Sequence, residues 1–573
     1  MRKLKKQNNM ADIKKKIAAE ISKIIGTTVT ENDFSAPPKT DLGDLALPCF
    51  DIAKKTKKNP IEVAQKIVTG LTKSKLVSKS QAMGPYINLS VNDSKLVDFL
   101  SSDVLNNENF GCGKKTKKKL MVEFAHPNTL KAFHIGHLRN IVTGESIARI
   151  LANAGYEVVR ANYQGDVGLH VAKALWGVQQ LLGEFESIKK APLERRVQFL
   201  GKAYAFGAQN FEKDEAVKEE VYAVNDKVYK KSTDIKDLYN ETRVWSLEYF
   251  DHIYARVDSH FDRLYFESEV YKRGLELVEK FLAKGVFEQS EGAVIFPGEK
   301  FGLHNRVYIS GKGAPTYEAK DLALAELQFK EYNPQQIVHV VGKEQTEYFK
   351  VIFEAISQVF PKIKGKEFHL AYGWVSLKHG KMSSRTGNVV LGEWLLDEVE
   401  KQVQEIMKNS DVKNKAETIK DVALSAVKYA LLKVGVRVDL AFDINESVSL
   451  SGDSGPYLLY INARINSILD KTATKFLDKK LQIEKLHLRE RKLLLDLTDY
   501  PYVTAKAAAE LDPSLIARYL FNLAQDFNNF YADCPVLQTD DATKVFRLQL
   551  VAAVQSVMKK GLYLLGIPVV KKM

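Results

Sequence analysis

Two histidines flank a glycine in the segment Phe133–His137 (FHIGH), where a predicted strand gives way to a predicted helix. Free backbone amides and the dipole at a helix N-terminus favour a bound phosphate. Histidines there can donate hydrogen bonds to phosphate oxygens as charge builds up in a transition state, and Gly136 leaves room for a flat adenine. Chance would produce His-x-Gly-His roughly 0.01 times in such a chain. A zinc pair is the alternative, although no third ligand lies nearby in the sequence.

A second polar motif, Lys381–Gly387 (KMSSRTG), follows a predicted strand far downstream. Its lysine and arginine could close over a polyphosphate and stabilise the charge on a leaving group. By itself such a loop usually indicates only a solvated turn. Paired with the first motif, in this order on one sheet, it indicates phosphate chemistry much more specifically.

The segments around both motifs predict a parallel nucleotide-binding sheet. Apolar runs favour strands at 120–125, 157–163, 337–341 and 368–375, and apolar residues at helical spacing favour a helix at 137–154. Strand, loop, helix and strand in one short stretch form a βαβ unit, whose two strands run parallel.

The 573 residues allow three or four domains at roughly 150 residues each. We predict a multidomain α/β plus α protein. Its parts are a small α+β N-terminal domain at 1–112, a catalytic domain at 118–400 with a helical insertion at about 172–260, and an all-helical C-terminal domain at 401–573. Apolar stripes in this last domain predict helices at 418–434, 455–470, 511–531 and 543–564.

Composition excludes several classes of protein. Hydrophobic residues make up 45% and charged residues 27%, which fits a folded chain and not a disordered or collagen-like one. The sequence contains no run of about 18 uncharged apolar residues, so we predict no membrane span. The basic N-terminus lacks the apolar core of a secretion signal. The three cysteines form no Cys-x-x-Cys pair, so we expect a reducing compartment and no zinc ribbon. The net charge of +13 suits a polyanionic partner or simply a lysine-rich surface.

The two motifs together resemble the signature pair of class I aminoacyl-tRNA synthetases. The surrounding sequence is similar to the arginyl-tRNA synthetases in particular, over nearly the whole chain. The segments that carry this resemblance are Gly43–Ala46, Gly84–Asn88, Glu123–Asn128, Lys131, Gly136–Asn140, Asn162–Gly168, Gly455–Arg464 and Gly561–Ile567.

The resemblance implies a Rossmann-type catalytic domain, an additional N-terminal domain that contacts tRNA, and a helical anticodon-binding domain. The implied reaction converts arginine and ATP to arginyl-adenylate and then transfers the arginyl group to the 3′-terminal adenosine of tRNA-Arg, with tRNA needed even for the first step. Mg²⁺ would accompany ATP through ligands that the sequence does not reveal, and a cytoplasmic monomer is expected. The implied ATP site consists of His134, Gly136, His137, Lys131, Lys381, Met382, Ser383, Ser384 and Arg385.

One position departs from the common form of the second motif. The fourth residue is usually lysine, and here it is Ser384. Many arginyl enzymes share this loss and carry a lysine just before the histidine motif, which is Lys131 in this chain. A positive charge lost from one wall of the phosphate site would then be replaced from the opposite wall.

The resemblance also implies a pocket for the arginine substrate. A guanidinium group presents five donors in a rigid fork and suits carboxylates and a flat face. We expect Asp321 to bind the guanidinium with Tyr317 beside it, Glu123 to pair with the α-amino group, and Asn128 to hold the backbone end. Gln345 completes the predicted set, although its surroundings depart from several family versions.

The predicted C-terminal helices carry candidate tRNA contacts. Tyr460 and Arg464 share a helix face at a spacing of four residues, and Tyr457 lies in the same helix. An exposed aromatic ring beside an arginine suits stacking on an unpaired base, whereas a buried core tyrosine is the alternative. We expect Phe527, Phe530 and Tyr531 to lie in the core.

Three other functions compete with this interpretation. Another class I synthetase is the first, but glutamyl and glutaminyl enzymes would need a basic substrate pocket and cysteinyl enzymes a zinc site. A small-molecule nucleotidylyltransferase would not need the long helical C-terminal domain. A non-catalytic tRNA-binding paralogue would be free to lose His134, His137 and Lys381, all of which are present.

Overall fold

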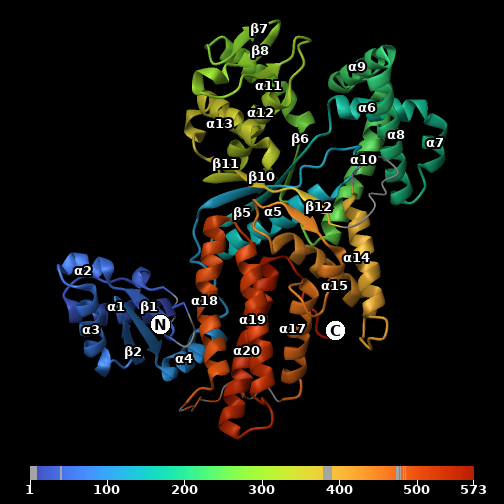
Figure 1. Ribbon diagram of the computed structural model, residues 1–573. Coiled ribbons are helices and arrows are strands. Elements are labelled where there is room, and N and C mark those ends of the chain that lie inside the picture. The colour runs from blue at the N-terminus through green and yellow to red at the C-terminus, as the bar shows by residue number, and fades with distance from the viewer. Residues whose placement is uncertain are drawn as a thin grey trace, which may run out of the picture.

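The computed structural model describes residues 10–378, apart from 36 and 39–41, and residues 390–573, apart from 473–475, 478, 480, 482 and 484. The N-terminal domain lies beside a bundle of long helices, and the α/β part of the chain lies above that bundle (Figure 1). The predicted closing loop, with Lys381, Met382, Ser383, Ser384 and Arg385, lies outside the described residues.

A five-stranded parallel sheet forms the centre of the catalytic region. Its strands are β4 (Lys119–Glu123), β5 (Glu157–Gln164), β6 (Arg263–Phe266), β10 (Gln336–Gly342) and β11 (Glu367–Tyr372), in the order β11-β10-β4-β5-β6. The strand order therefore reverses between β4 and β10, and in such sheets ligands bind at the carboxyl ends of the strands beside this reversal. The structure confirms the predicted parallel sheet and adds β6.

The helix after the histidine motif, α5 (Ile135–Asn153), is buried over most of its length. It packs on β4, β5 and β10 on one side and on helices of the C-terminal region on the other. Two helices that cover the sheet beyond β10 complete the site, α12 (Tyr317–Tyr332) and α13 (Thr346–Val359).

The predicted insertion is helical and has a hydrophobic core of its own. It consists of α6 (Leu169–Gln180), α7 (Leu182–Ile188), α8 (Leu193–Lys213), α9 (Glu215–Lys230) and α10 (Thr233–Arg256). Helix α11 (Glu267–Leu282) and a small antiparallel sheet of β7 (Glu288–Ser290), β8 (Ala293–Phe296) and β9 (Arg306–Ile309) follow β6. This small sheet was not predicted, because its strands are only three or four residues long.

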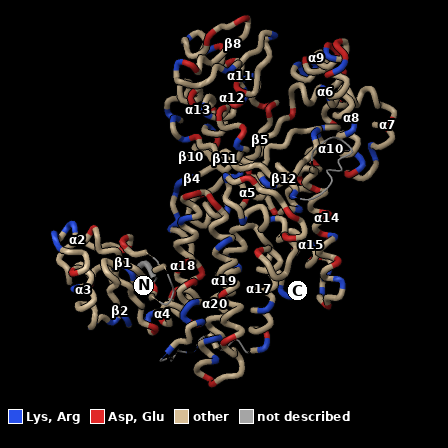
Figure 2. The backbone as a smooth tube through the Cα atoms, in the orientation of Figure 1, with Lys and Arg blue, Asp and Glu red and all other residues tan. Residues whose placement is uncertain are grey.

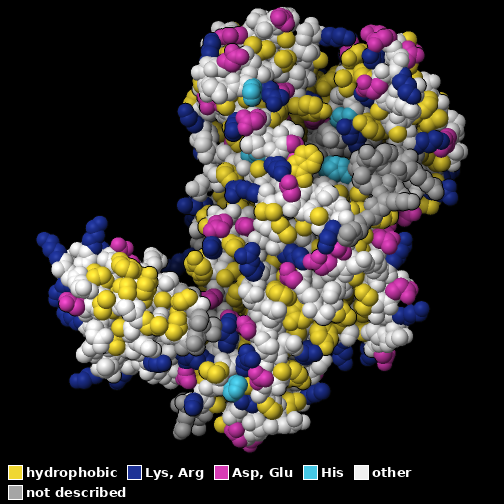
Figure 3. Space-filling view, in the orientation of Figure 1, with side chains coloured by type: hydrophobic (Ala, Val, Ile, Leu, Met, Phe, Trp, Pro, Cys, Tyr) yellow, Lys and Arg dark blue, Asp and Glu magenta, His cyan; other side chains and the backbone are white. Residues whose placement is uncertain are grey.

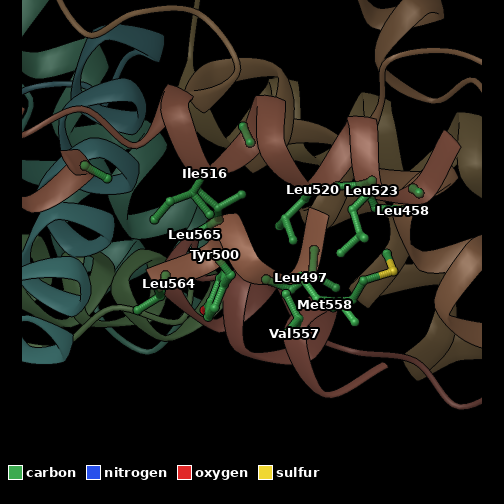
Figure 4. Packing of buried hydrophobic residues seen from close by; sticks show 14 of the residues in the cluster. Leu458, Leu497, Tyr500, Ile516, Leu520, Leu523, Val557, Met558, Leu564 and Leu565 are labelled. Atoms are coloured by element: carbon green, nitrogen blue, oxygen red, sulfur yellow. The ribbon is translucent and has the colours of Figure 1, made fainter. Parts of the chain in front are cut away.

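The C-terminal region is helical, as predicted, apart from β13 (Leu440–Phe442), which pairs with β12 (Val375–Leu377). Its helices are α14 (Gly392–Ile406), α15 (Lys415–Leu432), α16 (Ile444–Ser447), α17 (Gly455–Leu469), α18 (Leu488–Glu510), α19 (Ser514–Asp533) and α20 (Asp541–Leu564). Figure 4 shows how leucines 458, 497, 520 and 523 meet Val557 and Met558 between α17, α18, α19 and α20. None of the helices in the described ranges is long and apolar enough to span a bilayer.

The N-terminal domain contains a three-stranded antiparallel sheet with helices around it. Its elements are α1 (Met10–Ile25), β1 (Leu45–Pro48), α2 (Phe50–Thr56), α3 (Pro60–Gly70), β2 (Val77–Met83), β3 (Tyr86–Val91) and α4 (Asp93–Phe99). Arg491 of α18 forms ion pairs with Asp44 and Asp93 and so ties the domain to the helical bundle. In the view of Figure 2, basic and acidic positions are interspersed over all parts of the chain.

Candidate active site

The loop between β4 and α5 is held in an unusual backbone conformation. Ala125 and His126 both have positive φ angles, 81° and 49°. Side chains fix them, because the amide of Ala125 donates to Asn140 Oδ1 (2.6 Å) and the amide of His126 donates to Asn162 Oδ1 (3.2 Å). Strained backbone that its surroundings hold in place is typical of functional sites. The loop leads directly into the histidine motif.

His134 and His137 form a stacked pair at the N-terminus of α5, with ring centroids 3.8 Å apart. His134 Nδ1 accepts from the Gly136 amide (3.1 Å), and His137 Nδ1 accepts from the His134 amide (3.2 Å). Because each Nδ1 is an acceptor, each neutral ring carries its proton on Nε2. Both side chains can therefore donate a hydrogen bond from Nε2 to a phosphate. A Cβ atom on Gly136 would lie 2.9 Å from the His134 ring, so the glycine is also required for this packing.

Burial lowers the pKa of His134, with a further contribution from the charge of Lys131. Burial lowers the pKa of His137 well below its usual value, and the two neighbouring histidines and Lys131 act in the same direction. The rings are thus neutral donors at physiological pH. Burial also lowers the pKa of Lys131, whose Nζ lies 5.4 Å from the centroid of the Tyr204 ring.

Both ends of the segment that carries the second motif are anchored to the first motif. On one side, the buried guanidinium of Arg139 donates to the carbonyl oxygens of Trp374 (2.7 Å) and Val438 (2.7 Å). On the other side, the amide of Ile135 donates to Val390 O, and the amide of Gly392 donates to Phe133 O. The described residues that flank the second motif in the sequence, Trp374 and Val390, therefore lie beside the first motif.

A cavity of about 570 Å³ opens at the carboxyl ends of β4 and β10. Seven of the predicted site residues line it, namely Glu123, Asn128, His134, His137, Tyr317, Asp321 and Gln345. The structure thus brings these seven predicted residues to one cavity. The predicted roles within the cavity remain predictions.

Asp321 is one of the acidic residues that line this cavity. Tyr348 donates a hydrogen bond of 2.8 Å to its Oδ2, and no ion pair involves it among the described residues. Burial raises the pKa of Asp321 to about 8, and the charges of Glu123, Glu318 and Glu267 act in the same direction. An acidic group left without a countercharge in a cavity is suited to a cationic ligand.

Other members of the predicted pocket lie at its rim or have protein partners. Tyr317 is 53% exposed at the start of α12, and the Lys320 Nζ lies 4.5 Å from its ring centroid. Gln345 is exposed before α13. Glu123 is buried, and both of its oxygens already accept hydrogen bonds, Oε1 from His339 (2.9 Å) and Oε2 from Gln328.

The structure corrects one predicted tRNA contact. Tyr457 is buried and packs edge-on against Phe521, so its ring is not open to a base. Its position in α17 turns it toward the bundle core, whereas Tyr460 remains 37% exposed. Arg464 Nη2 donates to the Tyr460 hydroxyl (2.6 Å), as the shared helix face predicted.

Tyr531 also differs from the prediction. Phe527 and Phe530 are fully buried as expected, but Tyr531 is 42% exposed. Its ring centroid lies 5.6 Å from the guanidinium carbon of Arg464, which is also 4.8 Å from the ring centroid of Tyr460. The exposed rings of Tyr460 and Tyr531 and the partly buried guanidinium of Arg464 together form one aromatic and basic surface across α17 and α19.

Sequence reasoning missed several polar residues of the cavity, and among them are Gln328, His339, Tyr348 and Glu367. Gln328 and Tyr348 lie on helix faces without any motif. A signal was available for His339, because a single histidine interrupts the apolar strand run IVHVV at 337–341.

A parallel sheet with this strand order, a His-x-Gly-His motif at its first crossover helix and a helical C-terminal domain together define a class I aminoacyl-tRNA synthetase. Comparison with protein families agrees with this class. Residues 100–444 match the class I tRNA synthetase (R) catalytic domain, residues 458–573 the DALR anticodon-binding domain, and residues 11–91 the arginyl-tRNA synthetase N-terminal domain.

Individual relatives narrow the class further. The chain is 33% identical to an arginine–tRNA ligase of Treponema denticola, over 94% of this chain and 95% of that protein. It is 34% identical to the arginine–tRNA ligase of Bdellovibrio bacteriovorus, over 94% and 93%. The arginyl-tRNA synthetase structure of Thermus thermophilus superposes with a TM-score of 0.79 at 26% identity, covering 98% of this chain and all of that one. The chain belongs to the arginyl-tRNA synthetase family.

Proposed function

We propose that this chain joins L-arginine to tRNA-Arg in two steps. In the first, an oxygen of the arginine carboxylate attacks the α-phosphorus of ATP, and pyrophosphate leaves. In the second, a hydroxyl of the 3′-terminal adenosine attacks the carbonyl carbon of arginyl-adenylate, and AMP leaves. The observation that carries this proposal is the acidic cavity around Asp321, which adjoins two neutral histidines at the N-terminus of α5.

In this proposal, binding of the arginine substrate depends on the negative charge of the cavity. Asp321 would give up its proton and bind the guanidinium, while the hydroxyl of Tyr348 keeps the carboxylate in place. Tyr317, at the cavity mouth, would cover the guanidinium plane. Glu123 and Asn128 would hold the α-amino and carboxyl end close to the histidines. Gln345 at the rim is the remaining predicted contact.

Binding of the ATP phosphates would depend on neutral hydrogen-bond donors and a nearby cation. The Nε2 protons of His134 and His137 would bind phosphate oxygens, because both Nδ1 atoms are engaged by backbone amides. Lys131, whose charge acts on both histidines, would supply the positive charge missing at Ser384. Lys381, Met382, Ser383 and Arg385 would complete the phosphate site from the anchored segment.

Mg²⁺ would arrive with ATP. The described residues hold no group of three or more histidine, cysteine, aspartate or glutamate side chains placed to bind a metal ion. The phosphates would therefore be its principal ligands. A bound ion would shield their negative charge.

Two surfaces would contact tRNA. The anticodon side would use Tyr460, Arg464 and Tyr531, where two exposed rings lie near a partly buried guanidinium. The N-terminal domain would use a patch of exposed hydrophobic side chains, with basic side chains around it (Figure 3). Phe50 and Tyr86 of this domain are 50% and 44% exposed and in edge-to-face contact.

We also propose a cytoplasmic monomer. The three free cysteines suit a reducing compartment. Sedimentation of the purified chain with and without tRNA tests the monomer.

The deciding experiment is ATP–pyrophosphate exchange with each amino acid, with and without total tRNA. We expect exchange with arginine only, and only when tRNA is present. Exchange without tRNA would leave the ligase activity intact and remove the tRNA requirement. A folded, tRNA-binding protein without any exchange would favour the non-catalytic alternative.

A further inference from the structure

The imidazole of His339 lies between two carboxylates from neighbouring strands. β10 runs between β4 and β11, and His339 is the register partner of Glu123 on β4. Its Nδ1 is 2.9 Å from Glu123 Oε1, and its Nε2 is 2.6 Å from Glu367 Oε2. A carboxylate oxygen carries no proton to give, so both ring nitrogens donate and the ring is an imidazolium.

The two carboxylates depend on this ring to different degrees. Glu123 has a second donor, because Gln328 donates to its Oε2. Glu367 is different, since its Oε1 has no hydrogen-bond partner among the described residues and its side chain is only 4% exposed. His339 is therefore the cation that neutralises Glu367, and it is also the donor that fixes Glu123 Oε1.

All four of these side chains line the cavity that contains Asp321. A carboxylate that is bonded at both oxygens has little freedom to rotate, yet each oxygen keeps a lone pair for a further donor. The orientation of the Glu123 carboxylate is thus set by His339 and Gln328, which line the same cavity. Other titratable groups near His339 are His126 in the loop after β4 and His369 on β11.

We propose that His339 is a positioning residue for arginine, which acts through Glu123 and does not touch the substrate. It holds the Glu123 carboxylate so that the free lone pairs face the α-ammonium group. It also neutralises Glu367, so that the Glu367 carboxylate does not compete with Glu123 for the α-ammonium group. This inference rests on the proposed arginine–tRNA ligase function and adds a residue to its specificity pocket.

Replacing His339 by an apolar ring would leave two buried carboxylates close together without their cation. One of them would take up a proton or turn away, because like charges at this distance disfavour joint ionisation. The ammonium group of arginine would then lose a fixed, charged partner. ATP, bound at the N-terminus of α5, would keep all of its contacts.

The test compares His339→Phe with His369→Phe as a matched control. His369 lies opposite His339 in the register of β10 and β11, but it contacts a carbonyl oxygen, Val341 O, and not a carboxylate. We expect His339→Phe to raise the arginine KM in tRNA-dependent exchange about tenfold or more, since a hydrogen bond to a charged group is lost. The ATP KM should stay unchanged in both variants, and the arginine KM unchanged in His369→Phe.

Two further variants separate positioning from folding. His339→Gln keeps one donor and should raise the arginine KM less than His339→Phe. The double variant His339→Phe/Glu367→Gln removes the uncompensated charge, so it should regain thermal stability but keep the high arginine KM, because Glu123 still lacks its donor.

Three results would overturn the inference. They are a wild-type arginine KM in His339→Phe, full recovery of the arginine KM in the double variant, and a neutral His339 ring in the ¹⁵N NMR spectrum of the wild-type protein at pH 8. The assay of the wild-type protein distinguishes failure of this inference from failure of the proposed function. If wild-type protein shows no arginine-dependent exchange, the ligase proposal fails, whereas a normal wild type with an unaffected His339→Phe removes only the role of His339.

Discussion

The hydroxyl of Tyr348 lies 2.8 Å from Asp321 Oδ2 and donates a hydrogen bond to a carboxylate whose pKa burial raises to about 8. Tyr348 is on α13 and Asp321 is on α12, so the two helices hold the acid between them. One neutral donor does not offset the cost of burying this charge. The carboxylate is therefore ready to be neutralised by a cationic substrate, and several expectations follow from its pKa.

Arginine binding should depend on pH. Below pH 8 the empty site keeps Asp321 protonated, and a guanidinium that binds must displace that proton. The arginine KM should therefore fall as pH rises from 6 to 8, by up to about tenfold per pH unit, and level off above pH 8. Steady-state exchange across this range, with the ATP KM measured in parallel, checks the slope. A flat arginine KM would exclude Asp321 as the guanidinium partner.

Asp321→Asn should have opposite effects on thermal stability and on arginine binding. The folded pKa of Asp321 lies above the usual value of 3.8, so its contribution to stability is fully present below pH 4 and is lost as pH rises through about 8. At pH 8.5 the asparagine variant, which carries no charge, should unfold a few degrees higher than the wild type. It should bind arginine far more weakly. Thermal unfolding and arginine titration of both proteins give the comparison, and a less stable variant at pH 8.5 would contradict it.

Lys131→Ala should slow activation more than it weakens arginine binding. Lys131 acts on His134 and His137 through its charge. We expect kcat of exchange to fall at least tenfold with the arginine KM within a factor of two or three. Lys236→Ala, on the exposed surface of α10, is the control. Unchanged kcat in Lys131→Ala would end the idea that it replaces the lysine missing at Ser384.

Tyr531→Ala should weaken tRNA binding. The exposed ring lies near the guanidinium of Arg464, as the Tyr460 ring does, and stacking of one base on an aromatic ring contributes about 1–3 kcal/mol. The tRNA Kd should rise about fivefold or more at constant salt, with the ATP KM unaltered. Tyr502→Ala removes a tyrosine that is 67% exposed on α18 and serves as the control. If both substitutions raised the tRNA Kd equally, the effect would come from removing any exposed tyrosine and not from a specific base contact.

The sequence allowed much of the fold to be predicted, because long apolar runs and helical stripes mark the strands and helices that bury a full face. β4, β5, β10 and β11 were found in this way. Short or polar elements were not, such as β6 with its sequence RLYF and α18, whose helical pattern is interrupted by Pro501.

The candidate site was predictable where a motif carried it and not where packing alone created it. His134, Asp321 and Glu123 were recognised through their motifs, and all three line the cavity. His339 and Glu367 come from strands that read as core, and only the register of the sheet reveals that they meet. The spacing of Tyr457 and Tyr460 did not reveal that the first faces the bundle core.

The hydrogen bonds that flank residues 379–389 bear on where the chain tolerates insertions. Arg139 holds Trp374, and Phe133 and Ile135 hold the backbone at Val390 and Gly392. These short-range contacts, and not the length of chain in between, keep Trp374 and Val390 beside the first motif. Segments between the first motif and Trp374, such as α7 to α9, can lengthen or shorten without breaking these contacts. The exposed turns between those helices are accordingly where we expect insertions and tags to be tolerated best.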